Sequence, residues 1–386
     1  MSAPTAGLRR ERVRASAQFR DGSFRNTTGR SVALKGSQLP IIGELIFGGR
    51  ARAPREPLAV ESPLAAWARP AEASRLRITW LGHSTMLLET GGVRVLTDPV
   101  FGDRASPVSF AGARRFHAVP ATIDQLPPLD AVLLSHDHYD HLCHESMRAL
   151  AKRRVPIVTS LGVGAHLERF GVDPAVITEL DWWESHTLPG SAVSFTATPA
   201  QHFSGRSLTD RNATLWSSWV IQTNEHRAFF SGDTGLTDEL TTIGQRLGPF
   251  DVTMLEIGAW HPSWGDIHLG PANALRAFEM LGGGTLLPVH WGTFDLALHA
   301  WDEPAETLLS LASAAHARVL TPSLGRPFEP ALVDGPTPWW RRGTSEVATV
   351  PDELSTPAIR LVVSRGSEQR RRGTKARRDT GLIGPG

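Results

Sequence analysis

The chain has 386 residues, of which 41% are hydrophobic, enough apolar material for one large core or two smaller ones. Lys and Arg number 40 against 39 Asp and Glu, so the net charge of +1 provides no global field that would attract nucleic acid, and no nucleic-acid partner is expected. The single cysteine, Cys143, excludes an internal disulfide and fits a reducing compartment. No apolar run reaches the roughly 18 residues of a membrane span, and residues 1–22 lack the apolar segment of a secretory signal. These features predict a cytoplasmic protein.

Composition divides the chain into three parts. Residues 1–74 are rich in Arg, Pro and Gly, and we expect them to form an arm that packs on the core. Inside this arm, residues 39–47 are apolar, which indicates either docking on the main domain or contact with lipid. Residues 75–330 are expected to form a single domain. Residues 331–386 are expected to form a C-terminal extension with a disordered basic tail at 365–378, which either binds an anionic partner or is simply solvated.

Strand and helix signals alternate between residues 75 and 330. Strands are expected at residues 76–80, 85–89, 93–97, 131–134, 157–160, 193–197, 215–222, 228–231, 253–257 and 285–290. Helices are expected at residues 144–153, 162–170, 237–247, 271–281 and 304–315. Many of the strands are apolar throughout, as in sheets that are covered on both faces. The alternation therefore predicts an α/β domain.

A dense set of metal ligands follows the apolar stretch 131–134, in the run SHDHYDHL at residues 135–142. The candidate ligands are His136, His138, Asp140 and His141. A strand that ends at Ser135 would let the first two point toward one cation and the last two toward another. Imidazole and carboxylate ligands without thiolate are typical of catalytic metal sites. The alternative is a solvated polar loop, but such a loop does not need four residues of this kind.

Three further candidate ligands stand where expected strands end, and a rigid sheet edge can hold a coordination sphere in place. They are His202, Asp233 and His290. The first zinc would bind His136, His138 and His202. The second zinc would bind Asp140, His141 and His290, and Asp233 would bridge the two. Taken singly, each of the three is more often an ordinary polar residue at a strand end, but the ordered set favours a dinuclear site.

The sequence resembles the metallo-β-lactamase fold superfamily from residue 76 to about residue 300. The matching segments are WLGHSTMLLE at 80–89, LTDP at 96–99, LPPLDAVLLSHDHYDHL at 126–142, LDWWE at 180–184, GDTG at 232–235 and HWGTF at 290–294. LDWWE and HWGTF are similar to the branch that contains N-acyl-phosphatidylethanolamine-hydrolysing phospholipase D and its bacterial relatives. Two departures stand out. Asp137 occupies a position that is Asn in the mammalian lipid enzyme, and GAWHPSW at 258–264 replaces a GAYxPR pattern whose Arg is a candidate phosphate contact.

The resemblance implies an αββα sandwich of two mixed β-sheets flanked by helices, in a single domain. It implies two zinc ions per chain, with iron or manganese as alternatives, and a phospholipase D-like phosphodiesterase that acts on N-acyl-phosphatidylethanolamine or a related lipid. A hydroxide that bridges the metals would attack the phosphorus. Asp140 and Asp233 would be catalytic residues in this reaction in addition to being metal ligands. The alternative is a lactonase or other carboxylic-ester hydrolase of the ascorbate-6-phosphate lactonase type. The expected partners are a phospholipid or another phosphodiester and the inner membrane face as a peripheral contact, and a homo-oligomer is left open.

Five further residues are candidates for supporting roles. We expect His268 to protonate the leaving oxygen, although a loop histidine with a capping role is an equal alternative. His83 and Asp98 are expected to orient the metal ligands, as such sites usually require, with a buried structural histidine and a turn-forming aspartate as the alternatives. Arg206 and Arg211 could hold a phosphate through two donors each, or could form structural ion pairs.

Overall fold

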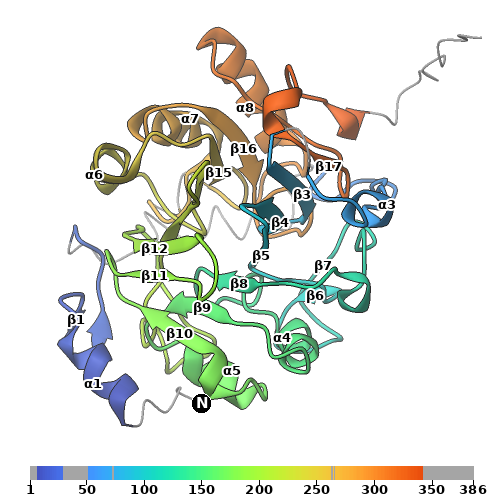
Figure 1. Cartoon of the computed structure of the whole chain (residues 1–386). Helices are drawn as coiled ribbons and strands as arrows, with labels where there is room; N and C mark the ends of the chain where they lie inside the picture. The colour runs from blue at the N-terminus through green and yellow to red at the C-terminus, as the bar shows by residue number, and fades with distance from the viewer. Residues whose placement is uncertain (1–6, 29–50, 72–73, 262–263, 265, 342–386) are drawn as a thin grey trace, which may run out of the picture. The chain divides into compact units, whose positions relative to one another are not determined.

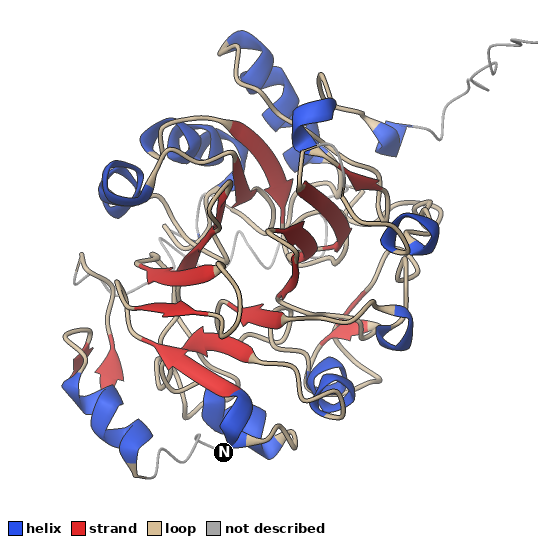
Figure 2. Cartoon of the chain, in the orientation of Figure 1, coloured by secondary structure: helices blue, strands red, loops and turns tan. Residues whose placement is uncertain are grey.

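The computed structural model describes residues 7–28, 51–71, 74–261, 264 and 266–341, which belong to one compact unit, Met1–Gly343. Two central β-sheets carry helices on their outer sides (Figures 1 and 2). The expected α/β sandwich with two mixed sheets is therefore confirmed. The apolar segment 39–47 and the basic stretch 365–378 lie outside the described residues.

The first sheet has seven strands in the order β10-β9-β8-β5-β4-β3-β17. Their bounds are β3 Leu76–Gly82, β4 Thr85–Thr90, β5 Val93–Thr97, β8 Ala131–Leu134, β9 Ile157–Ser160, β10 Ile177–Leu180 and β17 Pro327–Phe328. In β8, Ala131 and Leu133 join the larger core cluster, which includes residues of both sheets, while Val132 and Leu134 join a separate cluster with Met147 of α4 (His144–Ala151). Because successive side chains point to opposite faces, a strand buried on both sides must be apolar throughout.

The second sheet has six strands in the order β11-β12-β13-β14-β15-β16. Their bounds are β11 Ser185–Thr187, β12 Ser194–Thr198, β13 Ser218–Gln222, β14 Arg227–Phe230, β15 Val252–Glu256 and β16 Thr285–Val289. Strands β14, β15 and β16 are each followed in the chain by a helix, α6 Glu239–Leu247, α7 Gly270–Met280 and α8 Glu303–Ala314 respectively. Helix α7 contacts β15, and α6 and α8 contact α7. Helix α5 Gly164–Arg169 packs on β10 of the other sheet.

Short elements complete the described part of the chain. They are α1 Leu8–Ala15, β1 Phe19–Arg20, β2 Ser23–Phe24, α3 Leu64–Trp67, β6 Arg104–Ala105, β7 Ala113–Arg114 and 3-10 helices at Ile123–Gln125, Pro174–Val176, Pro330–Leu332 and Trp339–Arg341. Among the described residues, no helix combines the length and the apolar character that crossing a bilayer requires.

The N-terminal residues are more ordered than their composition suggests. Val13 of α1 and Phe24 of β2 are buried in a cluster with Trp182 and Trp216. The Asn26 side chain donates to the carbonyl of His202 at 2.9 Å and accepts from the backbone N–H of His202 at 3.0 Å. This segment therefore helps to fix the backbone of one candidate metal ligand.

One strand expectation needs correction, and some strands at the sheet edges were not expected. The strand expected at 215–222 begins only at Ser218, because the N–H groups of Leu215 and Ser217 bond to the carbonyls of Leu161 and Ser135 in the loops after β9 and β8. Strands β10 and β11 were not expected. Both lie at sheet edges and are partly exposed and polar, so they lack the apolar run that marks the inner strands.

The compact unit extends beyond the boundary expected at residue 330. Trp339 and Trp340 are buried, and both contact Trp291, with ring centroids 5.9 Å and 5.0 Å from it. Trp339 also lies 6.0 Å from Trp80 of β3. The first residues of the expected C-terminal extension therefore pack in the core.

Candidate metal centre

The seven expected ligands lie at one end of the two sheets. The metal loop, residues 135–142, follows β8, and His202, Asp233 and His290 follow β12, β14 and β16. Strands β14, β15 and β16 are mutually parallel, and β12 has the same direction because it pairs antiparallel with β13, as β14 does. The carboxyl ends of these strands therefore meet, and residues more than 150 positions apart in the chain come together.

The seven expected ligands and His83 fall into two groups, within each of which the ligand atoms all lie within 4.8 Å of one another. The first group is His136, His138, His202 and Asp233, and the second is His83, Asp140, His141 and His290. A third group of the same kind, Asp233, Glu256, His268 and His290, shares one residue with each of them. In the first group, His138 Nδ1 lies 2.9 Å from His136 Nε2 and 3.3 Å from His202 Nε2. In the second group, Asp140 Oδ2 lies 3.2 Å from His290 Nε2.

Asp233 faces both groups with different oxygens. Its Oδ2 lies 3.8 Å from His136 Nε2 and 3.6 Å from His202 Nε2. Its Oδ1 lies 3.1 Å from His141 Nε2 and 3.2 Å from His290 Nε2. This is the arrangement that a carboxylate bridging two cations requires.

The donor set fits divalent cations. The Nε2 of His141 and the Oδ1 of Asp233 are buried and make no hydrogen bond within the described part of the chain. Buried polar atoms without partners are costly. The cost is removed when both atoms coordinate a cation, and nitrogen and oxygen donors are those that zinc, iron or manganese accept.

The pKa shifts of the metal-free groups show the same need for positive charge. Burial lowers the pKa of His290, but Asp233 and Asp140 outweigh it and raise the pKa to about 10. The pKa of His141 is raised well above its usual value by the same two carboxylates against the effect of burial. Burial raises the pKa of Asp233, yet His141 and His290 hold it well below its usual range. Without metal, protons on the histidines therefore balance the buried carboxylates.

The backbone at the centre is held in unusual conformations. His83, Asp98 and His290 have φ values of 52°, 30° and 64°, in the left-handed region that residues other than glycine rarely adopt. Such conformations persist only where the surroundings enforce them, and here the His290 N–H donates to the His83 carbonyl at 3.0 Å. Gly232 precedes the bridging aspartate with φ 52°, and a Cβ there would lie 2.6 Å from Ser135 Cβ. Close packing against Ser135 therefore requires glycine at the first position of the GDTG segment.

Asp98 and His83 both contact metal ligands. Asp98 Oδ2 lies 2.7 Å from His141 Nδ1, so the carboxylate can hold the proton on Nδ1 and leave Nε2 free for a metal. His83 Nε2 lies 3.0 Å from Asp140 Oδ2. Because the His83 nitrogen belongs to the second ligand group, His83 is placed to coordinate as well as to orient Asp140.

His268 lies beside the ligands, with its ring 5.1 Å from that of His202 and 5.4 Å from that of His290. Its Nδ1 lies 2.7 Å from Oε2 of Glu256, the last residue of β15. Sequence reasoning missed Glu256. The available signal was a charged residue that ends the otherwise uncharged strand VTMLE and follows its apolar Met and Leu, since a buried carboxylate needs partners.

The two arginine candidates lie beside the metal loop and over Phe203. Arg206 Nη1 donates to the carbonyls of Asp137 and Leu142, at 2.5 Å and 2.9 Å, and its guanidinium lies 4.1 Å from the Tyr139 ring centre. It therefore clamps the metal loop, and a phosphate contact of Arg206 stays a prediction. Arg211 is exposed and lies over Phe203, with its guanidinium carbon 4.8 Å from the ring centre.

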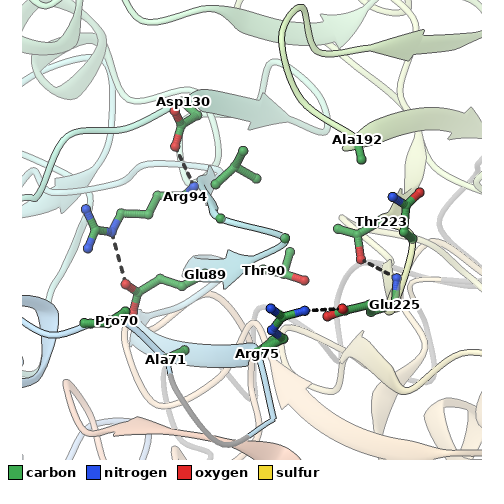
Figure 3. A pocket seen from close by; sticks show the side chains of 14 residues that line it. Pro70, Ala71, Arg75, Glu89, Thr90, Arg94, Asp130, Ala192, Thr223 and Glu225 are labelled. Carbon is green, nitrogen blue, oxygen red and sulfur yellow. Dashed lines mark hydrogen bonds and ion pairs between the residues drawn. The ribbon is translucent and has the colours of Figure 1, made fainter.

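Figure 3 shows a cavity of about 580 Å³ from close by. It lies at the amino ends of β5 and β8, opposite the end of the sheets where the metal centre lies. Its walls include Val93 at the start of β5 and Asp130 just before β8. Its charged groups already pair with one another, Arg94 with Glu89 at 3.0 Å and Arg75 with Glu225. The cavity therefore offers no ligand set comparable to the metal centre.

Comparison with known proteins identifies the family. The profile of a family described as the beta-lactamase superfamily domain matches residues 93–291, just over half of the chain. The chain belongs to the metallo-β-lactamase superfamily. An uncharacterised protein of Mycobacterium tuberculosis is 45% identical over 332 residues, which cover 84% of this chain and 88% of that protein.

One further relative refines this placement, and one solved structure shares the fold. N-acyl-phosphatidylethanolamine-hydrolyzing phospholipase D 1 of Caenorhabditis elegans is 36% identical over 62% of this chain and 71% of that protein, which confirms the expected branch. The metallo hydrolase Igni18 of Ignicoccus hospitalis has the same fold, with a TM-score of 0.52 and 22% identity over 66% of this chain and 98% of that one. The chain is therefore a metal-dependent hydrolase of this superfamily.

Proposed function

We propose that the chain is a dinuclear zinc phosphodiesterase that hydrolyses N-acyl-phosphatidylethanolamine or a related lipid, in the manner of a phospholipase D. The observation that carries the proposal is the position of Asp233, whose two oxygens face two separate ligand groups. The substrate class is supported by the likeness to the Caenorhabditis elegans phospholipase D.

The described residues would have the following roles in metal binding. One zinc would be held by His136, His138 and His202, and the other by Asp140, His141 and His290, with Asp233 shared. Bound zinc supplies Lewis acidity and lowers the pKa of water toward neutrality. Asp98 keeps the His141 Nε2 directed at the centre through its contact with Nδ1.

His268 is the proposed acid. In the overall reaction, an oxygen from water forms a bond to phosphorus while the bond from phosphorus to the departing oxygen breaks. The Nε2–H of His268 would give its proton to that oxygen, and the proton released by the attacking water would restore it. Burial lowers the pKa of His268, but Glu256 outweighs it and raises the pKa, which favours the protonated ring that a general acid requires.

A lactonase is the second candidate. The observation that favours it is the engagement of Arg206 with backbone carbonyls, together with the loss of the arginine of the GAYxPR pattern at residues 258–264. Both changes remove candidate phosphate contacts. A metal-activated water would attack a carboxylic ester with the same ligand set.

A lipid substrate must be met at the bilayer surface, and two exposed apolar residues lie on loops near the metal loop. Phe110 and Leu208 are 81% and 103% exposed. Their neighbours Pro107 and Ser207 line one cavity of about 270 Å³ together with Tyr139 of the metal loop. We include in the proposal that these two loop tips contact the membrane interface when the enzyme takes its substrate.

The test of the proposed function is a substrate panel with the zinc-loaded protein and its His268→Gln variant. The wild type should hydrolyse a lipid phosphodiester faster than a lactone. His268→Gln should lower turnover of the lipid by about two to four orders of magnitude with zinc content unchanged, and the defect should shrink on a p-nitrophenyl phosphodiester, whose leaving group needs no acid. Faster opening of the lactone, or equal defects on both phosphodiesters, would contradict the proposal.

A further inference from the structure

Glu256 is a buried carboxylate that the ligand set does not use. It ends β15 and has no exposed surface. Its Oε1 accepts from the backbone N–H of Thr234 at 2.7 Å and of Leu269 at 3.3 Å. Its Oε2 lies 2.7 Å from His268 Nδ1. One carboxylate thus ties together the segment after Asp233, the loop before α7 and the proposed acid.

The contacts of Glu256 determine which nitrogen of His268 faces the site. A carboxylate only accepts hydrogen bonds, so Nδ1 of His268 must be the donor. The backbone N–H groups on Oε1 fix the carboxylate, because it cannot rotate without losing both. Within the described residues, His268 makes hydrogen bonds only through Nδ1, and its side chain is 11% exposed. Nε2 is therefore the nitrogen left to exchange a proton with a substrate.

We propose that Glu256 is a positioning residue that holds the Nδ1–H of His268 and fixes the ring orientation, so that the doubly protonated ring presents its Nε2–H to the departing oxygen. This inference rests on the proposed function of His268. A carboxylate behind a catalytic imidazole holds the tautomer and the orientation of the ring without itself transferring a proton.

The variant that separates this role from a structural one is Glu256→Gln. A glutamine can keep an oxygen toward Thr234 and Leu269, but it then turns its NH₂ group toward His268 Nδ1. The NH₂ group is a donor, so His268 must accept on Nδ1 and carry its proton on Nε2. The fold keeps its contacts, but a ring that accepts on Nδ1 holds only the proton on Nε2, so it is neutral and a much weaker acid than the doubly protonated ring.

The matched control is Glu89→Gln. Glu89 is also a buried carboxylate, 6% exposed, and it pairs with Arg77 and Arg94 at the end of the sheets opposite the metal centre. Loss of this charge tests the effect of neutralising a buried glutamate on stability and turnover. It should not change how turnover depends on the leaving group.

Turnover is the first readout. Glu256→Gln should lower turnover of the lipid phosphodiester by about two to four orders of magnitude and turnover of the p-nitrophenyl phosphodiester much less, with two zinc ions retained. In the His268→Gln background, Glu256→Gln should add little further loss, because the two residues act as one unit. An equal loss on both substrates, or a full additional loss in the His268→Gln background, would overturn the proposal.

The second readout does not depend on activity or on the substrate. Long-range ¹H–¹⁵N spectra of the zinc-loaded, ¹⁵N-histidine-labelled protein report the protonation of each ring nitrogen, and His268→Gln assigns the signal. The wild type should show a protonated Nδ1 at His268, and Glu256→Gln should show an unprotonated one. An unprotonated Nδ1 in the wild type would overturn the proposal even if Glu256→Gln does not fold. If the wild type hydrolyses no phosphodiester, the proposed function fails, whereas this spectrum still decides the pairing of Glu256 with His268.

Discussion

Asp98→Asn should weaken one metal site and largely spare the other. Asp98 is fully buried and accepts from the Ser135 N–H at 2.8 Å, the Ser135 hydroxyl at 2.6 Å and His141 Nδ1 at 2.7 Å. Asparagine can keep the first of these contacts through its oxygen. Its NH₂ group then replaces the oxygen that faces the hydroxyl and His141. The imidazole must lose its Nδ1–H bond or move its proton to Nε2, the nitrogen that lies 3.1 Å from Asp233 Oδ1.

Loss of a carboxylate that orients a metal-bound histidine typically costs about 10- to 100-fold in metal affinity, which is about 1.4–2.7 kcal/mol. His141 belongs to only one ligand group, so we expect zinc titration against a competing chelator to show one site near wild-type affinity and one weakened site. The matched control is Asp130→Asn, since Asp130 also accepts a backbone N–H, that of Arg94 at 2.8 Å, but at the far end of the sheet. Equal weakening of both sites, or unchanged affinity, would refute the reasoning.

Three other perturbations test different parts of the account. Asp233→Ala should remove most of both metals and the activity, as measured by elemental analysis, and retention of two metals would rule out the bridging role. Zinc loading at pH 7 should release protons, measured by calorimetry in buffers of different ionisation enthalpy, because the pKa of His290 in the metal-free protein is raised to about 10. Zinc binding without proton release would contradict the raised pKa. The stabilisation of the metal-free protein by His290 is complete below about pH 6.5 and is lost as pH rises toward 10. Phe110→Ser with Leu208→Ser should reduce sedimentation with phospholipid vesicles, whereas Leu8→Ser, at a residue that is 78% exposed on α1, should not, and equal effects would argue against the proposed membrane contact.

The inner strands and the order of the ligands were readable from the sequence. Strands β5, β8 and β9 have the expected bounds, because strands with both faces buried are apolar runs bounded by turn residues. The ligand candidates follow strand ends, and a sheet with parallel strands brings such ends together, so the grouping could be inferred without knowledge of distances. The structure groups His136, His138 and His202 as the sequence predicts.

Other features depend on contacts that no local pattern encodes. The bond of Glu256 to His268 joins two positions across the loop between β15 and α7. Arg206 was a candidate phosphate ligand because a guanidinium can donate two hydrogen bonds at once, with a structural role as the alternative. Its Nη1 donates to carbonyls of a loop more than 60 residues earlier in the chain. Helix α1 has only one buried residue, Val13, and Arg9 pairs with Glu179 of β10 at 2.5 Å. An element held by such distant partners carries little periodic signal of its own.

The most direct test of the account is the hydrolysis of N-acyl-phosphatidylethanolamine by the zinc-loaded protein in ¹⁸O-labelled water, followed by mass spectrometry of the products. The proposed phosphodiesterase should yield phosphatidic acid and an N-acylethanolamine, with the ¹⁸O atom in the phosphate because water attacks phosphorus. The account would be contradicted if the label appeared in a fatty acid released by ester cleavage. It would also be contradicted if the protein left the phospholipid uncleaved but opened a lactone under the same conditions.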